Sequence, residues 1–219
     1  VNLNEPVVVG DYTDKNIIEL AGVRKCKEVF CVTRHLRRAL IAAEKVRELN
    51  PECDLYMRVF SEHFRNYMTC EPWNAYTFST SKWAMKSVKR WSKMITKDQE
   101  IIVLGNDTLV KRIVDYFARE LEAKIYLVDK EIDPEFFSAL PNVYPFQEKV
   151  SYLKNLEERF DMKAIKQIYI CWNSKDLFSD AILLTVALKQ QYPHIELFVR
   201  MFDEELAAIA KTIGVTTFS

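Results

Sequence analysis

The sequence lacks the features that mark several large classes of protein. Charge of neither sign is in excess, with 31 Lys and Arg against 31 Asp and Glu. A chain without a positive field is a poor candidate for general binding to nucleic acid. The longest uninterrupted apolar runs have only five residues, for example at 168–172 and 206–210. A helix needs roughly 20 to cross a bilayer. These absences favour a soluble protein with no membrane-inserted segment.

Cysteine and histidine are also sparse. The five cysteines contain no C-x-x-C pair and the three histidines are scattered, so neither set has the spacing of metal ligands. Cys31 and Cys171 lie within apolar runs, which is typical of buried thiols in a reducing compartment. The sequence shows no signal peptide and opens at Val1 rather than at a methionine, which indicates a fragment.

What is present is an internal repeat. The matching segments are 27–33 with 166–172, 54–60 with 196–202, and 76–79 with 216–219. In both copies an apolar strand pattern is followed by an amphipathic helix pattern and a proline turn. The offset stays between 139 and 142 residues, as the segment numbers show. By this offset the opening strand of the first copy falls before Val1, so we expect the chain to be an excerpt of a longer protein.

The second copy alternates strands with helices throughout. Its predicted strands are 100–105, 124–129, 143–147, 167–172, 195–202 and 215–218. Continuous apolar strand interiors and an opening of strand, glycine and helix (106–121) are typical of the doubly wound, dinucleotide-binding plan. We therefore predict an α/β fold with two Rossmann-like, doubly wound parallel-sheet domains in tandem, the first lacking its N-terminal strands.

The predicted domains meet near residue 97. Residues 1–97 hold the remainder of the first domain, including a linking helix at 81–95, and residues 98–219 hold the second domain without its last helix. Within the first domain we expect a strand at 7–9 and a helix at 14–21.

A ligand crevice is expected at the carboxyl ends of the strands of the second domain. Gly105 is the first glycine of a dinucleotide fingerprint, but Asp107 stands where the second glycine belongs. Asp129 follows Gly105 by 24 residues, where an acid that binds ribose is expected. The alternatives are a degenerate structural copy and, for Asp129, a solvated or capping side chain at a strand end. The degenerate copy is the favoured interpretation.

The first domain has a cluster of cations at the start of a helix. Arg34, Arg37 and Arg38 oppose the helix macrodipole there, which indicates a site for phosphate or for an acidic partner. Pairing with nearby acids, or simple solvation, is the equal alternative. Asp11 lies at the same edge and could accept a hydrogen bond from a ligand; its alternative role is the N-cap of helix 14–21.

Two further pairs of equivalent residues in the two copies indicate local roles. Arg58 and Arg200 occupy equivalent strand positions, and an arginine repeated in a buried strand needs an anionic partner. Structural pairing is the favoured interpretation, because both copies keep it. Trp172 aligns with Thr33 at the rim of the crevice, where we expect the indole to fill the pocket.

Several motifs of the first domain resemble the later half of a TrkA-N, or RCK, domain. They are the segment GDYTDKNIIELAGVRKCKEVFCVT (10–33), the turn ELNP (48–51) and MRVFSEHFRNYM (57–68). The positions that match the family pattern are Gly10, Asp11, Thr13, Asp14, Asn50, Pro51, Arg58 and Val59. The second domain is similar to the same family more weakly, through IIVLG (101–105), LVD (127–129) and VRMFDEE (199–205).

The resemblance implies a cytoplasmic regulatory module, held at the inner face of the membrane by the pore-forming part of a potassium channel or transporter. It implies a homo-oligomer that senses NAD(H) or an adenine nucleotide and is not an enzyme. The site residues carried over are Asp11, Thr33, Arg34, Gly105 and Asp129. Two alternatives stay open: an NAD(P)-dependent oxidoreductase, and a structural assembly module that binds no ligand.

Overall fold

In a computed structural model the chain forms two compact units, Val1–Thr80 and Ser81–Ser219. The structure describes residues 6–33, 35–59, 62–132, 134–137, 139–172, 177–201 and 204–218. The two units are described separately below. The expected domain boundary at 97 stays a prediction, and by its packing the helix that precedes it belongs to the second unit.

The first unit is a small parallel α/β layer. Its helices and strands are α1 (Lys15–Leu20), β1 (Glu28–Cys31), α2 (Leu36–Leu49), β2 (Asp54–Arg58), α3 (Glu62–Met68) and β3 (Tyr76–Phe78), with a 3-10 turn at Val23–Lys25. The sheet has the order β1-β2-β3 with all strands parallel. These are the counterparts of the fourth, fifth and sixth strands of a doubly wound sheet.

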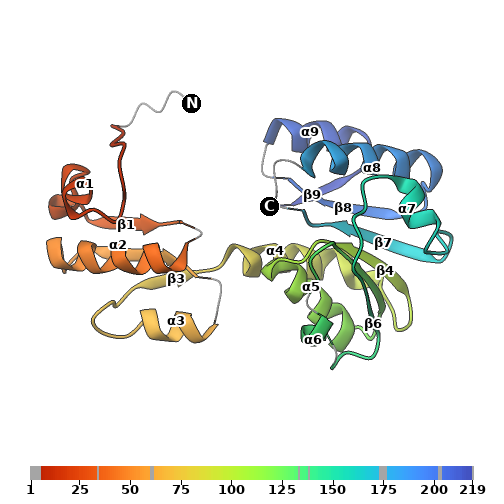
Figure 1. The fold of residues 1–219 in the computed structure, drawn as a ribbon, viewed down its shortest axis with the longest axis horizontal. Coiled ribbons are helices and arrows are strands. Elements are labelled where there is room, and N and C mark those ends of the chain that lie inside the picture. The colour runs from red at the N-terminus through yellow and green to blue at the C-terminus, as the bar shows by residue number, and fades with distance from the viewer. Residues whose placement is uncertain are drawn as a thin grey trace. The chain divides into compact units, whose positions relative to one another are not determined.

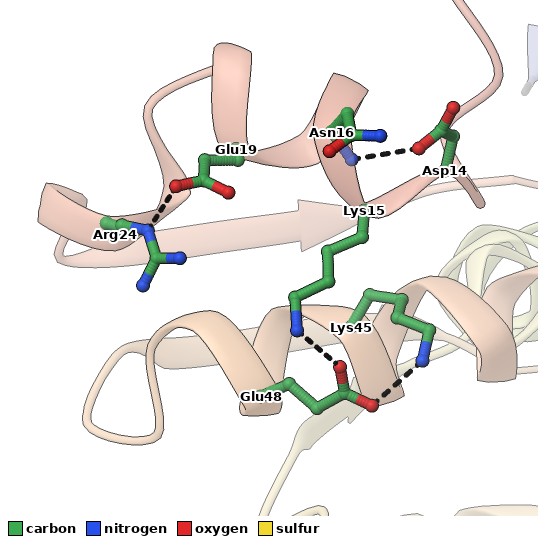
Figure 2. A network of polar contacts seen from close by, with 7 residues as sticks. All are labelled: Asp14, Lys15, Asn16, Glu19, Arg24, Lys45 and Glu48. Atoms are coloured by element: carbon green, nitrogen blue, oxygen red, sulfur yellow. Dashed lines mark hydrogen bonds and ion pairs between the residues drawn. The ribbon is translucent and has the colours of Figure 1, made fainter.

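Helix α1 begins at a different cap from the one considered for it. Asp14 is the N-cap, and its Oδ1 accepts a hydrogen bond from the amide of Asn16 at 2.9 Å. The N-cap role considered for Asp11 is therefore wrong, because the Asp14 carboxylate is one residue from the first helical turn. Figure 2 shows this cap and the pairing of Lys15 on α1 with Glu48 on α2, at 2.9 Å, and of Glu48 with Lys45 at 2.8 Å. The Lys15–Glu48 pair links α1 to α2, and because both pairs are exposed they contribute little to stability.

The strand predicted at 7–9 does not form. The segment has no strand structure, and Val7 and Val9 are 64% and 90% exposed. In a doubly wound sheet the third strand pairs with the second, and the described part of this unit has only the last three strands. Without a neighbouring strand for its backbone, the apolar segment remains outside the sheet.

The two faces of the first sheet differ. One face packs in a core built from Leu55, Met57 and the buried residues of α2. The opposite face carries an aromatic ladder in which Tyr56 stacks on Phe30 at 4.5 Å and on Tyr76 at 5.0 Å between ring centroids. Phe30 is 59% and Tyr76 57% exposed.

The second unit contains a full six-stranded sheet. Its strands are β4 (Glu100–Leu104), β5 (Lys124–Val128), β6 (Val143–Phe146), β7 (Ile165–Ile170), β8 (Glu196–Arg200) and β9 (Thr216–Phe218). Its helices are α4 (Thr80–Trp91), α5 (Thr108–Arg119), α6 (Pro134–Phe137), α7 (Leu153–Glu157), α8 (Phe178–Gln191) and α9 (Glu204–Thr212). The order β6-β5-β4-β7-β8-β9, all parallel, is the doubly wound order 3-2-1-4-5-6. The predicted fold class is confirmed.

Helices cover both faces of this sheet. Figure 1 shows α5 and α6 on one face and α7, α8 and α9 on the other. Each face has its own hydrophobic core, one including residues of α4, α5 and α6 and the other residues of α7, α8 and α9. Strand interiors are buried on both sides, which explains the continuous apolar runs in the sequence.

The repeat is visible in the packing of aromatic rings. Tyr169 and Phe198 are paired in register and stack at 4.7 Å, as Phe30 and Tyr56 do in the first unit. In the second unit Trp91 of α4 covers this stack, at 5.0 Å from the Phe198 ring. The helix predicted at 81–95 runs over Thr80–Trp91 and continues as a 3-10 turn at Ser92–Met94. Over the described ranges, every helix is too short or too polar to cross a bilayer.

Candidate ligand-binding crevice

A cavity of about 390 Å³ opens at the carboxyl end of the second sheet. It lies where β4 stands between β5 and β7 and the strand order reverses, which is where doubly wound proteins bind ligands. Gly105 and Asp129, both predicted as site residues, line it together, and so does Asp107. The structure therefore brings the residues predicted for the second unit to one cavity.

Gly105 forms the tight turn that leads from β4 toward α5. Its φ of +126° is a conformation that L side chains rarely adopt. A Cβ here would lie 3.2 Å from Cγ2 of Val110 and 3.5 Å from the main chain of Cys171. The absence of a side chain lets α5 start close against the end of β7, as the first glycine of the fingerprint requires.

Asp107 occupies the start of α5 with its own negative charge. It is the N-cap of the helix, and its Oδ1 accepts hydrogen bonds from the amides of Leu109 and Val110 at 2.9 and 3.1 Å. Its Oδ2 accepts a hydrogen bond from the guanidinium of Arg200 at the end of β8. The Arg200 side chain is 8% exposed and that of Asp107 24%. This buried pair joins the helix terminus to a strand 93 residues further along the chain.

Asp129 follows β5 on the wall of the same cavity. Its Oδ1 accepts a hydrogen bond from the amide of Glu131 at 2.9 Å, which holds the carboxylate in a local turn. Asp129 is half-buried. An ionised carboxylate can accept about four hydrogen bonds, so one turn contact leaves it able to bind hydroxyl groups.

Four other charged residues line the cavity, and three of them take part in ion pairs. Lys130 pairs with Glu131 at 3.2 Å, and Glu148 pairs with Arg159 at 2.5 Å. Lys149 is the remaining one. Among the described residues, Lys130 and Lys149 of the lining together with the ion-paired Arg159 and Arg200 balance the four lining acids.

Cys171 and Trp172 also line the cavity. Burial raises the pKa of the Cys171 thiol far above its ordinary value, Asp107 adds to this and Arg200 opposes it. Cys171 is therefore held as a neutral thiol and is a poor nucleophile. Trp172 is half-buried and lines the cavity, but it does not fill it as expected, because about 390 Å³ stays open.

In the first unit, the predicted residues Asp11 and Thr33 belong to one cluster of side chains. The Tyr12 hydroxyl and the Thr33 Oγ1 are hydrogen bonded at 2.7 Å. The guanidinium of Arg38 stacks 4.6 Å from the centre of the Tyr12 ring and donates to Asp11 Oδ1 at 2.6 Å. Arg34, the third predicted residue, lies outside the described residues.

This geometry favours the pairing alternative for the basic cluster. Arg38 and Asp11 neutralise one another, so neither presents an uncompensated charge to a ligand. Arg37 is exposed. The phosphate site predicted at Arg34, Arg37 and Arg38 remains a prediction.

The carboxyl group of Asp11 provides a test of this cluster. Hydrogen bonds from the Thr13 amide and hydroxyl, and then from Arg38, lower the pKa of Asp11 from 3.8 to about 2. Since this pKa is lower in the folded than in the unfolded protein, the contribution to stability is complete above about pH 4 and is lost as the pH falls through about 2.

We expect a carboxyl-carbon NMR titration of Asp11 to show a midpoint near 2 in the parent protein. The Arg38→Ala substitution should move that midpoint upward, and Thr13→Val should do the same. A parent midpoint at the ordinary 3.8 would show that the cluster does not persist in solution.

Both repeated arginines have polar side-chain partners. Arg200 pairs with Asp107, and the Nη2 of Arg58 donates to the Oγ1 of Thr80 at 2.9 Å. The sequence pointed to Arg200 through its recurrence but not to its partner Asp107, which lies at the start of α5. In the part of the chain that the structure describes, no three His, Cys, Asp or Glu side chains converge as a metal site.

Comparisons with known proteins agree with this architecture. Residues 2–74, about a third of the chain, match the family model of the TrkA-N domain. A search of curated proteins finds no match.

Among solved structures, the chain is similar to GsuK bound to ADP, with 16% identity and a TM-score of 0.78 over 99% of this chain and 55% of that one. The GsuK RCK domain matches with 11% identity and a TM-score of 0.74, covering 96% of this chain and 63% of that one. The GsuK channel bound to NAD matches with 12% identity and a TM-score of 0.73, covering 96% and 52%. At these identities the likeness establishes a shared fold, and the chain spans little more than half the length of the structures that it matches.

Proposed function

We propose that this chain, whose residues 2–74 match the TrkA-N domain, is a regulatory module that controls potassium transport by a channel or transporter. The observation that carries the proposal is the fold, which is similar to that of GsuK bound to ADP over 99% of this chain. The TrkA-N match supports it separately, because it rests on sequence rather than on shape. In this proposal the chain forms homo-oligomers at the inner face of the membrane, and ligand binding changes the force that they exert on the pore-forming part.

A nucleotide, ADP or NAD(H), is the proposed class of ligand. The related GsuK structures hold ADP and NAD. The crevice of the second unit has the right position in the fold, and its 390 Å³ falls within the about 300–1,000 Å³ typical of small-molecule sites. In this proposal Asp129 accepts hydrogen bonds from the hydroxyls of a ribose.

Regulation rather than catalysis is proposed because of the state of the ionisable groups. Glu131 and Glu148 are held in ion pairs, and the thiol of Cys171 is neutral and buried. A hydride-transfer enzyme needs a positioned acid or base with an accessible proton, and in this proposal none of these three groups has that role.

Ligand sensing is tested by thermal unfolding with ADP, NAD, NADH, AMP and adenosine, together with light scattering for mass. A ligand at 100 times its dissociation constant stabilises a folded protein by about 2.7 kcal/mol, so a true site raises the melting temperature clearly. We expect a rise with an adenine compound and a mass larger than that of the monomer.

Asp129→Ala should remove most of that rise. Asp161→Ala is a matched control, because Asp161 accepts a hydrogen bond from the amide two residues ahead, at 3.1 Å, and is not among the residues that line the cavity. An equal loss of the rise in Asp129→Ala and Asp161→Ala would mean that removing an aspartate from a turn, rather than from the cavity, causes the loss. An oligomer whose melting temperature is indifferent to every ligand would support the structural assembly module instead.

Control of transport is tested separately, by rubidium flux into vesicles that contain the full protein carrying this chain. We expect the flux to change when the stabilising nucleotide is added on the inner side. Unchanged flux at saturating nucleotide would contradict the proposal.

A further inference from the structure

The start of α5 has three features of a phosphate site: backbone amides, a guanidinium and a nearby glycine. The side chain of Asp107 occupies this position. The amides of Leu109 and Val110 point toward the helix terminus, where a helix attracts anions. Arg200 brings a guanidinium that is 8% exposed to the same point, and Gly105 allows close approach of the turn. The anion found there is the carboxylate of Asp107, which takes both amides and the guanidinium.

We propose that Asp107 takes the place of a ligand phosphate, so that the cavity of the second unit binds a nucleoside-like ligand that carries ribose hydroxyls and has no phosphate at α5. This inference rests on the proposed function insofar as the cavity is a ligand site. It narrows the proposed class of ligand, because the phosphates of a nucleotide bound here add nothing to its affinity.

The charges around the cavity support this ligand class. The acids among the lining residues are Asp107, Asp129, Glu131 and Glu148, against the two lysines Lys130 and Lys149. Arg200 neutralises Asp107, and Arg159 neutralises Glu148. The described lining therefore has no excess of positive charge to attract a phosphate, and a pyrophosphate would have to displace a carboxylate from a buried ion pair, which is costly.

Among the polar lining residues, Asp129 suits hydroxyl groups. Asp129 has acceptor capacity beyond its turn contact with Glu131, and Trp172 contributes an aromatic side chain to the same cavity. A carboxylate and an aromatic ring are the groups with which proteins bind a ribose and a base.

The first arm of the test compares adenosine with ADP on the unmodified chain, by calorimetry at constant ionic strength. We expect the two dissociation constants to agree within about threefold, where productive helix-terminus contacts to phosphate would give about tenfold or more. ADP binding at least tenfold tighter than adenosine would overturn the inference. If neither compound binds, the ligand proposal for this cavity fails, and the second arm still decides whether Asp107 stands in for a phosphate.

The second arm uses inorganic phosphate as the probe and Asp107→Gly as the variant. Glycine is tolerated at an N-cap, so the substitution chiefly removes the carboxylate and releases the two amides and Arg200 from it. We expect a lower melting temperature that recovers with phosphate in a saturable way, at matched ionic strength. The unmodified chain should show no such saturable effect.

Asp14→Gly is the matched control, since it makes the same substitution at the N-cap of α1 and should show no recovery. Asp107→Asn keeps a capping oxygen over the amides, and it should recover less than Asp107→Gly. Failure of Asp107→Gly to recover, or equal recovery in Asp14→Gly, would overturn the inference. If Asp107→Gly does not fold, the comparison of adenosine with ADP on the unmodified chain decides the question.

Discussion

Replacing Arg200 by alanine is expected to destabilise the second unit by about 3 kcal/mol or more. Removal of one partner from a buried ion pair costs about 3–5 kcal/mol, because the other charge stays behind without its counterion. Arg200 is 8% exposed, and Asp107, at 24%, keeps some contact with water, so the lower end of that range applies. Urea unfolding followed by circular dichroism measures the change in the free energy of unfolding.

Arg119→Ala is the control for this substitution. Arg119 pairs with Asp115 at 2.7 Å in the same unit, but both side chains are more than half exposed, and such pairs contribute less than about 1 kcal/mol. Equal effects of Arg119→Ala and Arg200→Ala would show that the Arg200 pair is solvated in solution.

A double-mutant cycle isolates the pair itself. Combining Arg200→Met with Asp107→Asn removes both charges, and apolar replacement of a whole buried pair is often close to neutral. We therefore expect the double variant to lose much less stability than the sum of the two single losses. Additive losses would contradict a direct interaction between Arg200 and Asp107.

Replacing Phe117 by alanine is expected to cost about 3–5 kcal/mol, because truncation of a buried phenylalanine loses transfer free energy and leaves a cavity. Phe117 lies on α5, is fully buried, and has its ring 5.2 Å from that of Tyr169. This contact fastens α5 to β7, and with it the N-terminus that carries Asp107. Unfolding in urea and the heat capacity profile of the same variant provide the measurement.

Leu183→Ala serves as the comparison. Leu183 is on α8 and is 60% exposed, so its truncation should change the free energy of unfolding by no more than about 0.5 kcal/mol. If Phe117→Ala were equally mild, α5 would not be packed against the sheet as described. A loss in Phe117→Ala that also abolishes ligand binding would show that the position of the helix terminus matters to the crevice.

Much of the second unit could be predicted from its sequence, because strands that are buried on both faces have continuous apolar sequences. The strand expected at 124–129 forms at Lys124–Val128, and the one at 100–105 forms at Glu100–Leu104. The helix expected at 106–121 begins at Thr108 instead, because Asp107 caps it. The repeat also aligned the aromatic positions that stack in both sheets, since residues in register on parallel strands face the same side.

The first unit shows where local pattern is insufficient. The apolar segment at 7–9 has the composition of a strand, yet the partner strand that would hold its amides and carbonyls is not among the described residues. A pattern of alternating or continuous hydrophobicity indicates which residues avoid water, but pairing decides whether they form a sheet. The sequence suggested Asp11 as an alternative cap of α1, and only the geometry of the turn showed that Asp14 is the cap.

The sequence by itself determined the α/β class, the repeat and the identity of Gly105, Asp107 and Asp129, because these follow from hydrophobic periodicity and from spacing along the chain. It identified Asp107 as the residue that stands where the second glycine of the dinucleotide fingerprint belongs. Only the tertiary structure decided that Asp107 is paired with Arg200, that a cavity of about 390 Å³ remains beside it, and that its charges balance. Contacts between residues 93 positions apart depend on how strands and helices are packed, and no local pattern encodes that packing.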